Sequence, residues 1–200
     1  MVLVARICFL LVAAATGLLA ASFSQADVCV PQNEANAWPN DAFYAVGPAN
    51  ISCVMEAARR QCVAQNVLLA LASLESGKNG QFVRNTNGSY DIGHFQLNTI
   101  HWTRGGAFFQ HPLITQQAVA QRGCFNAELA AWLLRRAQST CKSTDFWRCS
   151  ANYHSATPGP NQVYRRKLIA LSREWGNWLK TNYPSGVSVT YQRVARGTPQ

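Results

Sequence analysis

Apolar residues recur at helical spacing soon after residue 50. Asn50 can cap a helix, and the apolar positions that follow it fall on one side: Ile51, Val54, Met55, Ala58 and Cys62. A second helix is predicted over residues 67–76, with Asn66 as its cap and Gly77 as its stop. Two helices therefore open the predicted domain, and the second is the most apolar stretch after the leader.

Helical spacing returns in the second half of the chain. It predicts four more helices, over residues 114–122, 126–139, 146–153 and 161–182. The last and longest carries a predicted buried face of large side chains: Tyr164, Leu168, Leu171, Trp175 and Trp178. The resulting helices would form one core.

The pattern changes between residues 78 and 93. Asn79-Gly80, Asn87-Gly88 and Gly93 mark turns, and residues 82–83 and 89–90 fit short extended pieces. A helix is predicted again over residues 95–101. The fold class predicted is mainly α (α+β), a helical domain with a small extended wing.

The N-terminus fits a secretory signal peptide over residues 1–26. Arg6 is the only charge before Asp27, residues 7–21 are apolar or small, and Ser24-Gln25-Ala26 suits a cleavage site. The apolar run is about 15 residues, short of the ~20 that span a bilayer. We expect an exported protein, periplasmic or secreted, with no transmembrane segment after signal cleavage.

The mature chain divides into three predicted parts. An irregular lead-in rich in Pro, Asn and Ala covers residues 27–49, the domain covers 50–182, and a loose tail covers 183–200. With 200 residues and 48% hydrophobic residues, the chain suits one core.

Cysteine content agrees with export. Of seven cysteines, Cys8 leaves with the leader, and the rest are disulfide candidates: Cys29, Cys53, Cys62, Cys124, Cys141 and Cys149. Their even number predicts up to three disulfides, whose pairing the sequence leaves open. There is no Cys-x-x-Cys pair, and the four histidines lack close ligand spacing, so no metal and no cofactor are expected.

The formal net charge of +9, or +8 without Arg6, is compatible with several anionic partners: lipid, nucleic acid or an acidic wall polymer. The basic residues are scattered apart from Arg59-Arg60, Arg135-Arg136 and residues 165–167. These clusters are expected on solvated helix faces, so charge alone names no partner.

Glu75 is the residue with the clearest chemical potential. The chain has nine acidic residues, and most lie where solvation is easy, but Glu75 ends the most apolar predicted helix. Burial raises the pKa of a carboxyl group, and a carboxyl that stays protonated near neutral pH can donate its proton to a leaving oxygen. A buried, paired glutamate with a structural role is the competing interpretation.

Four segments occur in an order that resembles the soluble lytic murein transglycosylases (the SLT-domain family). They are Glu75-Ser76, Gly93-His94-Phe95-Gln96, Asn152-Tyr153-His154-Ser155 and Tyr164. More narrowly, the chain resembles the small single-domain members associated with conjugation, type IV secretion and related export systems. The resemblance covers roughly residues 50–180. His94 and His154 depart from the family pattern.

The resemblance implies a lysozyme-like helical fold, stabilised here by disulfides. It also implies cleavage of the MurNAc-GlcNAc β-1,4 bond of peptidoglycan with formation of 1,6-anhydro-MurNAc. Glu75 would be the catalytic acid and base. The implied partners are peptidoglycan glycan strands and components of a secretion or conjugation apparatus, with no nucleic acid.

The resemblance also suggests which residues bind substrate: Ser89, Gly93, Phe95, Gln96, Tyr153, His154 and Tyr164. Turn or core-packing roles are the alternatives for Gly93, Phe95, Gln96 and Tyr164. His101 and His111 are expected to be structural or on the surface.

Asp91 leaves the reaction type open. As a second carboxylate in the cleft it would allow a muramidase-type hydrolase, a lysozyme. The favoured interpretation is that its side chain holds the Asn87-to-Gly93 turn by bonding backbone amides. The remaining alternatives are a non-catalytic peptidoglycan-binding module, a cysteine peptidase that uses Cys149 and His154, and a eukaryotic secreted lysozyme, which two formal glycosylation sequons beginning at Asn50 and Asn87 would suit.

Overall fold

The computed structural model describes residues 44–184, and over this range the protein is mainly helical. The helices are α2 (Ile51–Arg60), α3 (Gln65–Glu75), α4 (Gln116–Gln121), α5 (Gly123–Thr140), α6 (Phe146–Ala151) and α7 (Pro158–Asn182). The predicted wing is an antiparallel sheet of β1 (Phe82–Arg84), β2 (Tyr90–Ile92) and β3 (Leu97–Asn98), followed by the 3-10 helix η2 (Thr99–Trp102). The mainly helical class with a small extended part is therefore confirmed.

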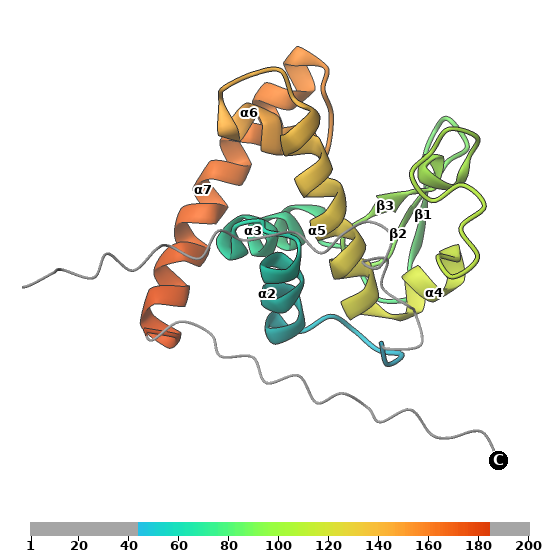
Figure 1. Cartoon of the computed structure of the whole chain (residues 1–200), viewed down its shortest axis with the longest axis horizontal. Helices are drawn as coiled ribbons and strands as arrows, with labels where there is room; N and C mark the ends of the chain where they lie inside the picture. The colour runs from blue at the N-terminus through green and yellow to red at the C-terminus, as the bar shows by residue number, and fades with distance from the viewer. Residues whose placement is uncertain (1–43, 185–200) are drawn as a thin grey trace, which may run out of the picture.

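Helix α3 lies at the centre of the helical body. It packs against α2 and α7, while α5 packs against α2, α4 and α6 and lies between α2 and the sheet (Figure 1). Five consecutive residues of α3 are buried, from Val67 to Leu71. A helix that is apolar all round belongs in a core, and this burial positions its C-terminal residue, Glu75, beside the sheet.

The boundaries of the first two helices were predicted with mixed success. Helix α2 begins after Asn50 as predicted, and the Asn50 Oδ1 accepts a hydrogen bond of 2.9 Å from the Cys53 amide. Helix α3 begins at Gln65, and Asn66 is not its cap, because the Asn66 amide group donates to the Ser172 carbonyl on α7 at 3.0 Å. Helix α3 ends one residue before the predicted Ser76, which adopts a left-handed conformation with φ of 50°.

The helix predicted over residues 95–101 was wrong. Gln96 has a φ of 49°, in the left-handed region that stops a helix. Leu97 and Asn98 then pair with β2 opposite Ile92 and Asp91, and only the short η2 follows. The apolar residues there satisfied a helical pattern, but the backbone bonds of this segment are made with another strand.

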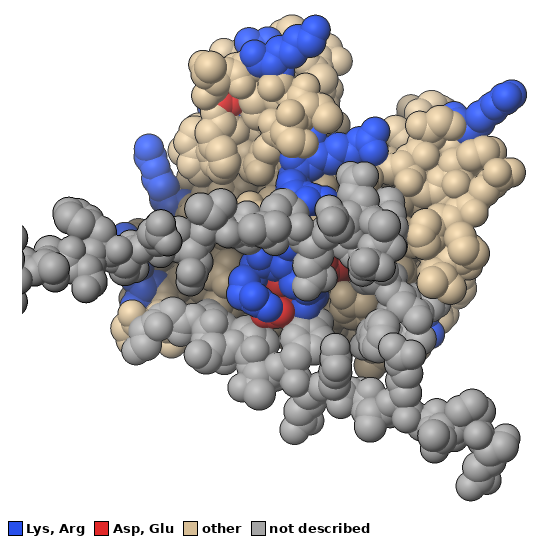
Figure 2. Space-filling view, in the orientation of Figure 1, with Lys and Arg blue, Asp and Glu red and all other residues tan. Residues whose placement is uncertain are grey.

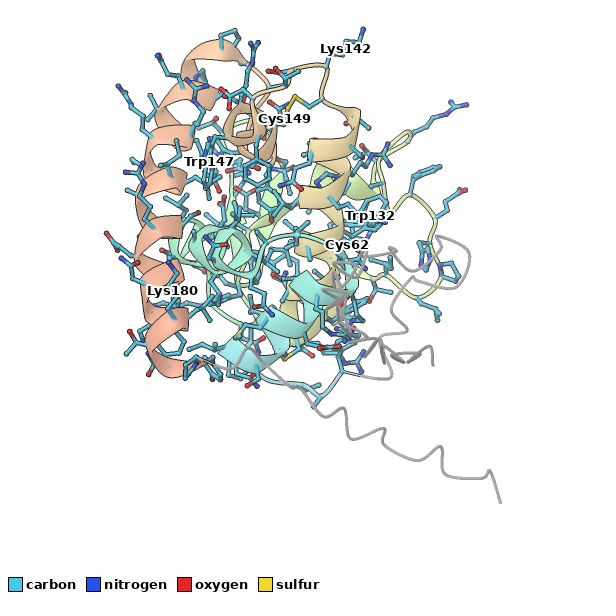
Figure 3. The ribbon with its side chains drawn as sticks, turned by 60° about the vertical axis from the view of Figure 1, so that its left-hand side comes forward. Cys62, Trp132, Lys142, Trp147, Cys149 and Lys180 are labelled. Atoms are coloured by element: carbon cyan, nitrogen blue, oxygen red, sulfur yellow. A yellow bond between two sulfur atoms is a disulfide. The ribbon has the colours of Figure 1, made fainter. Side chains whose placement is uncertain are left out.

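Two disulfides join described helices. Cys53 on α2 is bonded to Cys124 on α5, and Cys141 at the end of α5 is bonded to Cys149 on α6. Cys149 is labelled in Figure 3, beside its disulfide. Cys62 is disulfide-bonded as well. The prediction for Cys29 lies outside the described residues, as do those for the signal peptide, most of the lead-in and the tail beyond residue 184.

Two acidic residues expected in solvent are buried. Glu56 and Glu128 are each 2% exposed. Arg60 pairs with both, with 3.1 Å between its Nη1 and the Glu56 Oε1, and the side chain of Arg59 also bonds Glu56. Arg60 was therefore wrongly predicted to be solvated, because its carboxylate partner on α5 lies 68 positions away.

The remaining basic side chains are distributed over separate elements of the face in Figure 2 rather than gathered in one patch. None of the helices between residues 44 and 184 combines the length and apolarity needed to cross a membrane. The two disulfides are compatible with an exported protein.

Candidate active site

A pocket of about 560 Å³ brings Glu75 together with the sheet and the α6–α7 connection. Its polar walls come from three parts of the chain. Helix α3 contributes Glu75, the sheet and its turns contribute Asn85, Asn87, Asp91, Gln96 and Asn98, and the segment after α6 contributes Asn152, Tyr153, His154 and Ser155. The pocket therefore combines carboxylates with an unusual number of amide side chains.

Glu75 is half-buried, and its surroundings differ from those of the two buried glutamates, Glu56 and Glu128. The pKa of Glu75 is raised from 4.5 to about 7: burial raises it most, a hydrogen bond from Tyr164 lowers it, and the charge of Asp91 raises it. Glu56 and Glu128 are held by arginines, but within residues 44–184 no basic side chain forms an ion pair with Glu75. Glu75 is thus the carboxyl that can hold and release a proton near neutral pH.

Tyr164 fixes one oxygen of that carboxyl group. Its hydroxyl donates to the Glu75 Oε1 at 2.5 Å, and the Tyr164 side chain reaches there from α7, where the residue is 8% exposed. Burial and the charge of Glu75 raise the pKa of Tyr164 well above its ordinary value, so it remains a donor. With Oε1 held by Tyr164, a proton on the carboxyl group is carried by Oε2.

His154 supports Tyr164 from the pocket side. Its ring stacks on the Tyr164 ring, with centroids 4.6 Å apart and planes 3° from parallel. The histidine is itself exposed. His154, Tyr164 and Glu75 therefore form a continuous series of contacts from the pocket wall to the carboxyl group.

Gly77 lets the end of α3 lie directly on the loop before β3. Its amide donates to the His94 carbonyl at 3.2 Å. A Cβ at this position would lie 2.0 Å from the Gly93 carbonyl oxygen and 2.4 Å from the Gln96 Nε2. The close approach requires glycine, and it fixes Glu75 relative to Gln96, whose side chain donates to that same Gly93 carbonyl at 2.8 Å.

Asn126 was not identified from the sequence as a functional residue. It is fully buried on α5, and its Oδ1 accepts from the Phe95 amide at 2.8 Å while its Nδ2 donates to the Ile92 carbonyl at 3.0 Å. A buried amide that bonds backbone groups on both sides of a turn holds that turn in place. The only available signal was a polar residue at the start of an apolar helix.

Asp91 lies in the pocket, contrary to the favoured interpretation. Its carboxylate does not hold the turn through backbone amides; its Oδ1 accepts from the Asn98 Nδ2 at 2.7 Å across the sheet. Residues 91 and 98 are paired on β2 and β3, so the strand register sets this bond. Glu75 and Asp91 are therefore two carboxyl groups in one pocket.

The predicted substrate-binding residues divide into two groups. Gln96, Tyr153 and His154 line the pocket, whereas Ser89, Gly93, Phe95 and Tyr164 do not. The Phe95 side chain is fully buried in the core, and its carbonyl accepts a 3.0 Å bond from the Tyr153 hydroxyl. The Ser89 hydroxyl is engaged with Asn87 at 2.7 Å. Phe95 and Ser89 therefore support the pocket wall from behind and do not line the pocket.

His101 was expected to be structural or on the surface, but it lines the pocket. Burial, together with the positive charge of Arg136, lowers its pKa to about 4. His101 is therefore neutral at pH 7 and offers one nitrogen as donor and the other as acceptor.

The cysteine peptidase alternative is excluded, because Cys149 is bonded to Cys141 and a bridged sulfur is not a nucleophilic thiolate. Between residues 44 and 184 no group of three histidine, cysteine or acidic side chains is arranged to hold a metal ion.

The burial of Glu75 makes the stability of the protein depend on pH. Its folded pKa of about 7 lies above the ordinary 4.5, so the folded state holds this proton more tightly than the unfolded chain. The resulting stabilisation is complete below pH 4.5 and is lost as the pH rises through 7, on the order of 2 kcal/mol after allowance for partial exposure. We expect the free energy of unfolding of the wild type, relative to Glu75→Gln, to fall over this window in urea denaturation. A difference independent of pH would contradict the shift.

Comparison of the chain with protein-family models found no match, and comparison with curated proteins found none either. The fold and the site therefore define the protein by their own geometry: a mainly helical domain with a protonatable glutamate in a polar pocket between helices and sheet.

Proposed function

We propose that the protein is a peptidoglycan lytic transglycosylase with a lysozyme-like fold, and that it cleaves the MurNAc-GlcNAc β-1,4 bond. The observation that carries the proposal is Glu75, a half-buried carboxyl with a pKa of about 7 held by Tyr164 in an open pocket. Protonation of a glycosidic oxygen needs such an acid. The resemblance of the four motif segments supports the same assignment.

The proposed reaction uses Glu75 twice. Its Oε2 proton goes to the glycosidic oxygen as the bond from that oxygen to the anomeric carbon breaks. The Glu75 carboxylate then takes the proton from the 6-hydroxyl of the muramic acid that carries this anomeric carbon. The 6-oxygen bonds to the anomeric carbon in the same step. The products are a free 4-hydroxyl and a 1,6-anhydro sugar, and no water is consumed.

The amide side chains of the pocket suit an acetylated glycan. Asn85, Asn87, Gln96, Asn98 and Asn152 each carry a carbonyl acceptor and an NH₂ donor. The Gln96 Nε2 bonds the Gly93 carbonyl and the Asn98 Nδ2 bonds Asp91. N-acetyl sugars present amides and hydroxyls, which suit the donors and acceptors that remain, and no cofactor is needed. This composition favours a neutral saccharide backbone at the cleavage site over a nucleic acid, which would require cations against its phosphates.

A muramidase-type hydrolase is the second candidate, because Asp91 lies in the pocket with Glu75. In a hydrolase, Asp91 would act on a water molecule or on the sugar directly. Asp91 accepts a hydrogen bond from Asn98, which fixes the orientation of its carboxylate in the pocket. The same carboxylate in a transglycosylase would instead stabilise positive charge on the sugar ring.

Mass spectrometry of the products released from purified sacculi tests the proposal. We expect anhydro-muramic ends, each lighter by one water than a reducing end. Reducing ends would assign the hydrolase. Binding of sacculi without sugar products would assign a non-catalytic peptidoglycan-binding module.

The substitution Asp91→Asn gives a second way to distinguish the transglycosylase from the hydrolase. In a transglycosylase we expect anhydro products to persist with a rate lowered by roughly tenfold or less, because only charge stabilisation is lost. In a hydrolase the loss would be on the order of 10²-fold or more. Glu174→Gln, an exposed change on α7 outside the pocket, is the control.

The proposed setting is the periplasm, where the enzyme would open the wall locally for an envelope-spanning secretion or conjugation system. The disulfides between helices and the signal-like N-terminus support export. The assignment to such a system rests on the resemblance to the small single-domain transglycosylases.

A further inference from the structure

A second pocket of about 490 Å³ continues the first one along α5. Both pockets are lined by His101, Leu133, Asn152, Tyr153 and Ala156, so together they make one groove. The second pocket adds Gly105, Ala107, Arg136, Ala137, Thr140 and Cys141. The groove thus runs from the sheet, past Glu75, toward the disulfide that joins α5 and α6.

The residues that line only the second pocket have mostly small side chains, and Arg136 is the cation among them. Leu133, Arg136, Ala137 and Thr140 follow the spacing i, i+3, i+4 and i+7, which places them on one face of α5. In Figure 3, Trp132 lies part of the way along this helix and the Cys149 disulfide near its end. Among the described residues that line the second pocket, Arg136 is the only charged one, since His101 is neutral at pH 7.

Arg136 is held in place but has no anionic partner within residues 44–184. Its Cζ lies 5.4 Å from the centroid of the Trp132 ring, an arrangement that restrains the guanidinium while leaving its donors available. Its guanidinium makes no ion pair and no hydrogen bond with a described residue; the hydroxyls of Ser139 and Thr140 bond only its backbone carbonyl. The side chain is exposed at the groove wall. An arginine so placed suits a carboxylate from a ligand.

We propose that Arg136 is a specificity-determining residue that binds a carboxylate of the stem peptide carried by the glycan, so that stem-bearing strands are preferred over stripped ones. This inference rests on the proposed peptidoglycan substrate. The sugar backbone of that substrate is neutral, and in a stem-bearing unit the lactyl carboxyl is consumed in the amide bond to the peptide. The negative charges therefore lie on the stem, which branches away from the sugars. The small residues around Arg136 leave room for such a branch.

The test compares two soluble substrates: uncrosslinked glycan strands with their stems, and the same strands after an amidase has removed the stems. Amide hydrolysis leaves one lactyl carboxylate on each muramic acid of the stripped strands, next to the sugar, but no carboxylate on a branch. We expect the ratio of kcat/KM for stem-bearing over stripped strands to fall about tenfold in Arg136→Ala, the size of a lost charge-assisted bond. Arg136→Lys should retain part of the preference. Arg135→Ala is the matched control, because it removes the same charge at a residue outside the groove.

An unchanged ratio in Arg136→Ala, or an equal fall in Arg135→Ala, would overturn the proposal. A binding measurement separates it from the proposed function. If the wild type cleaves neither substrate, the transglycosylase assignment fails, and binding of both strands to Glu75→Gln and to Glu75→Gln/Arg136→Ala decides the role of Arg136. A preference for stem-bearing strands that Glu75→Gln shows and the double variant loses supports that role. The role is contradicted if Glu75→Gln shows no preference, or if the double variant keeps it.

Discussion

Glu75→Gln is expected to lower the rate of glycan cleavage by on the order of 10²- to 10⁴-fold, the range of a general acid–base contribution. Glutamine has the size of glutamate, and its Oε1 can still accept the bond that Tyr164 makes at 2.5 Å. It has no proton to give to the glycosidic oxygen. Product release from sacculi is the measurement, with the thermal midpoint as a check on folding.

The folded variant should be at least as stable as the wild type at pH 8, because the charged Glu75 is desolvated and glutamine is not. It should also still bind sacculi. Glu174→Gln makes the same chemical change on the exposed face of α7 and should keep wild-type activity. Wild-type-like cleavage by Glu75→Gln would contradict the proposed mechanism.

Gly77→Ala is expected to destabilise the fold by about 1–3 kcal/mol, the usual effect of overpacking. It should also reduce cleavage by about 10²-fold. The added methyl would lie 2.0 Å from the Gly93 carbonyl oxygen, a backbone atom that cannot move without displacing the loop. That loop carries Gln96, and the helix end before Gly77 carries Glu75. A displacement of about 1 Å near reacting groups can cost about 10²-fold in rate.

Gly176→Ala is the matched control for Gly77→Ala, with the opposite expected sign. Gly176 lies within α7, and the nearest atom to its added Cβ is the Asn66 Nδ2 at 3.6 Å, an ordinary contact. Alanine should stabilise this helix by about 0.5–1 kcal/mol. Thermal unfolding and the cleavage assay compare the pair. Equal stability of the two variants would contradict the close packing at Gly77.

Local sequence patterns were sufficient to predict the features that depend on a single helix or turn. The cap at Asn50, the helical spacing after it and the turn signals at Asn87-Gly88 act over a few residues, so the chain fixes them without reference to the rest. The same holds for Glu75 as the chemically notable acid, because its place at the end of an apolar helix is a local feature. The cysteines predicted disulfides but not which cysteines pair.

Long-range contacts decided what the patterns could not. Arg60 and Glu128 look like solvated charges in the sequence, yet they pair across 68 positions in the core. Asn126 shows its role only when α5 packs against the loop from Ile92 to Phe95. Asp91 faces the pocket because of the register between β2 and β3, and a shift of one residue would turn it away.

The sequence by itself determined the helical class, the position of the wing and the identity of the candidate acid, because these depend on neighbours along the chain. Only the tertiary structure decided the environment of that acid: the bond from Tyr164, the carboxylate of Asp91 and the groove that leads to Arg136. The physical reason is that a pKa and a binding site depend on distances between side chains, which packing sets and sequence separation does not.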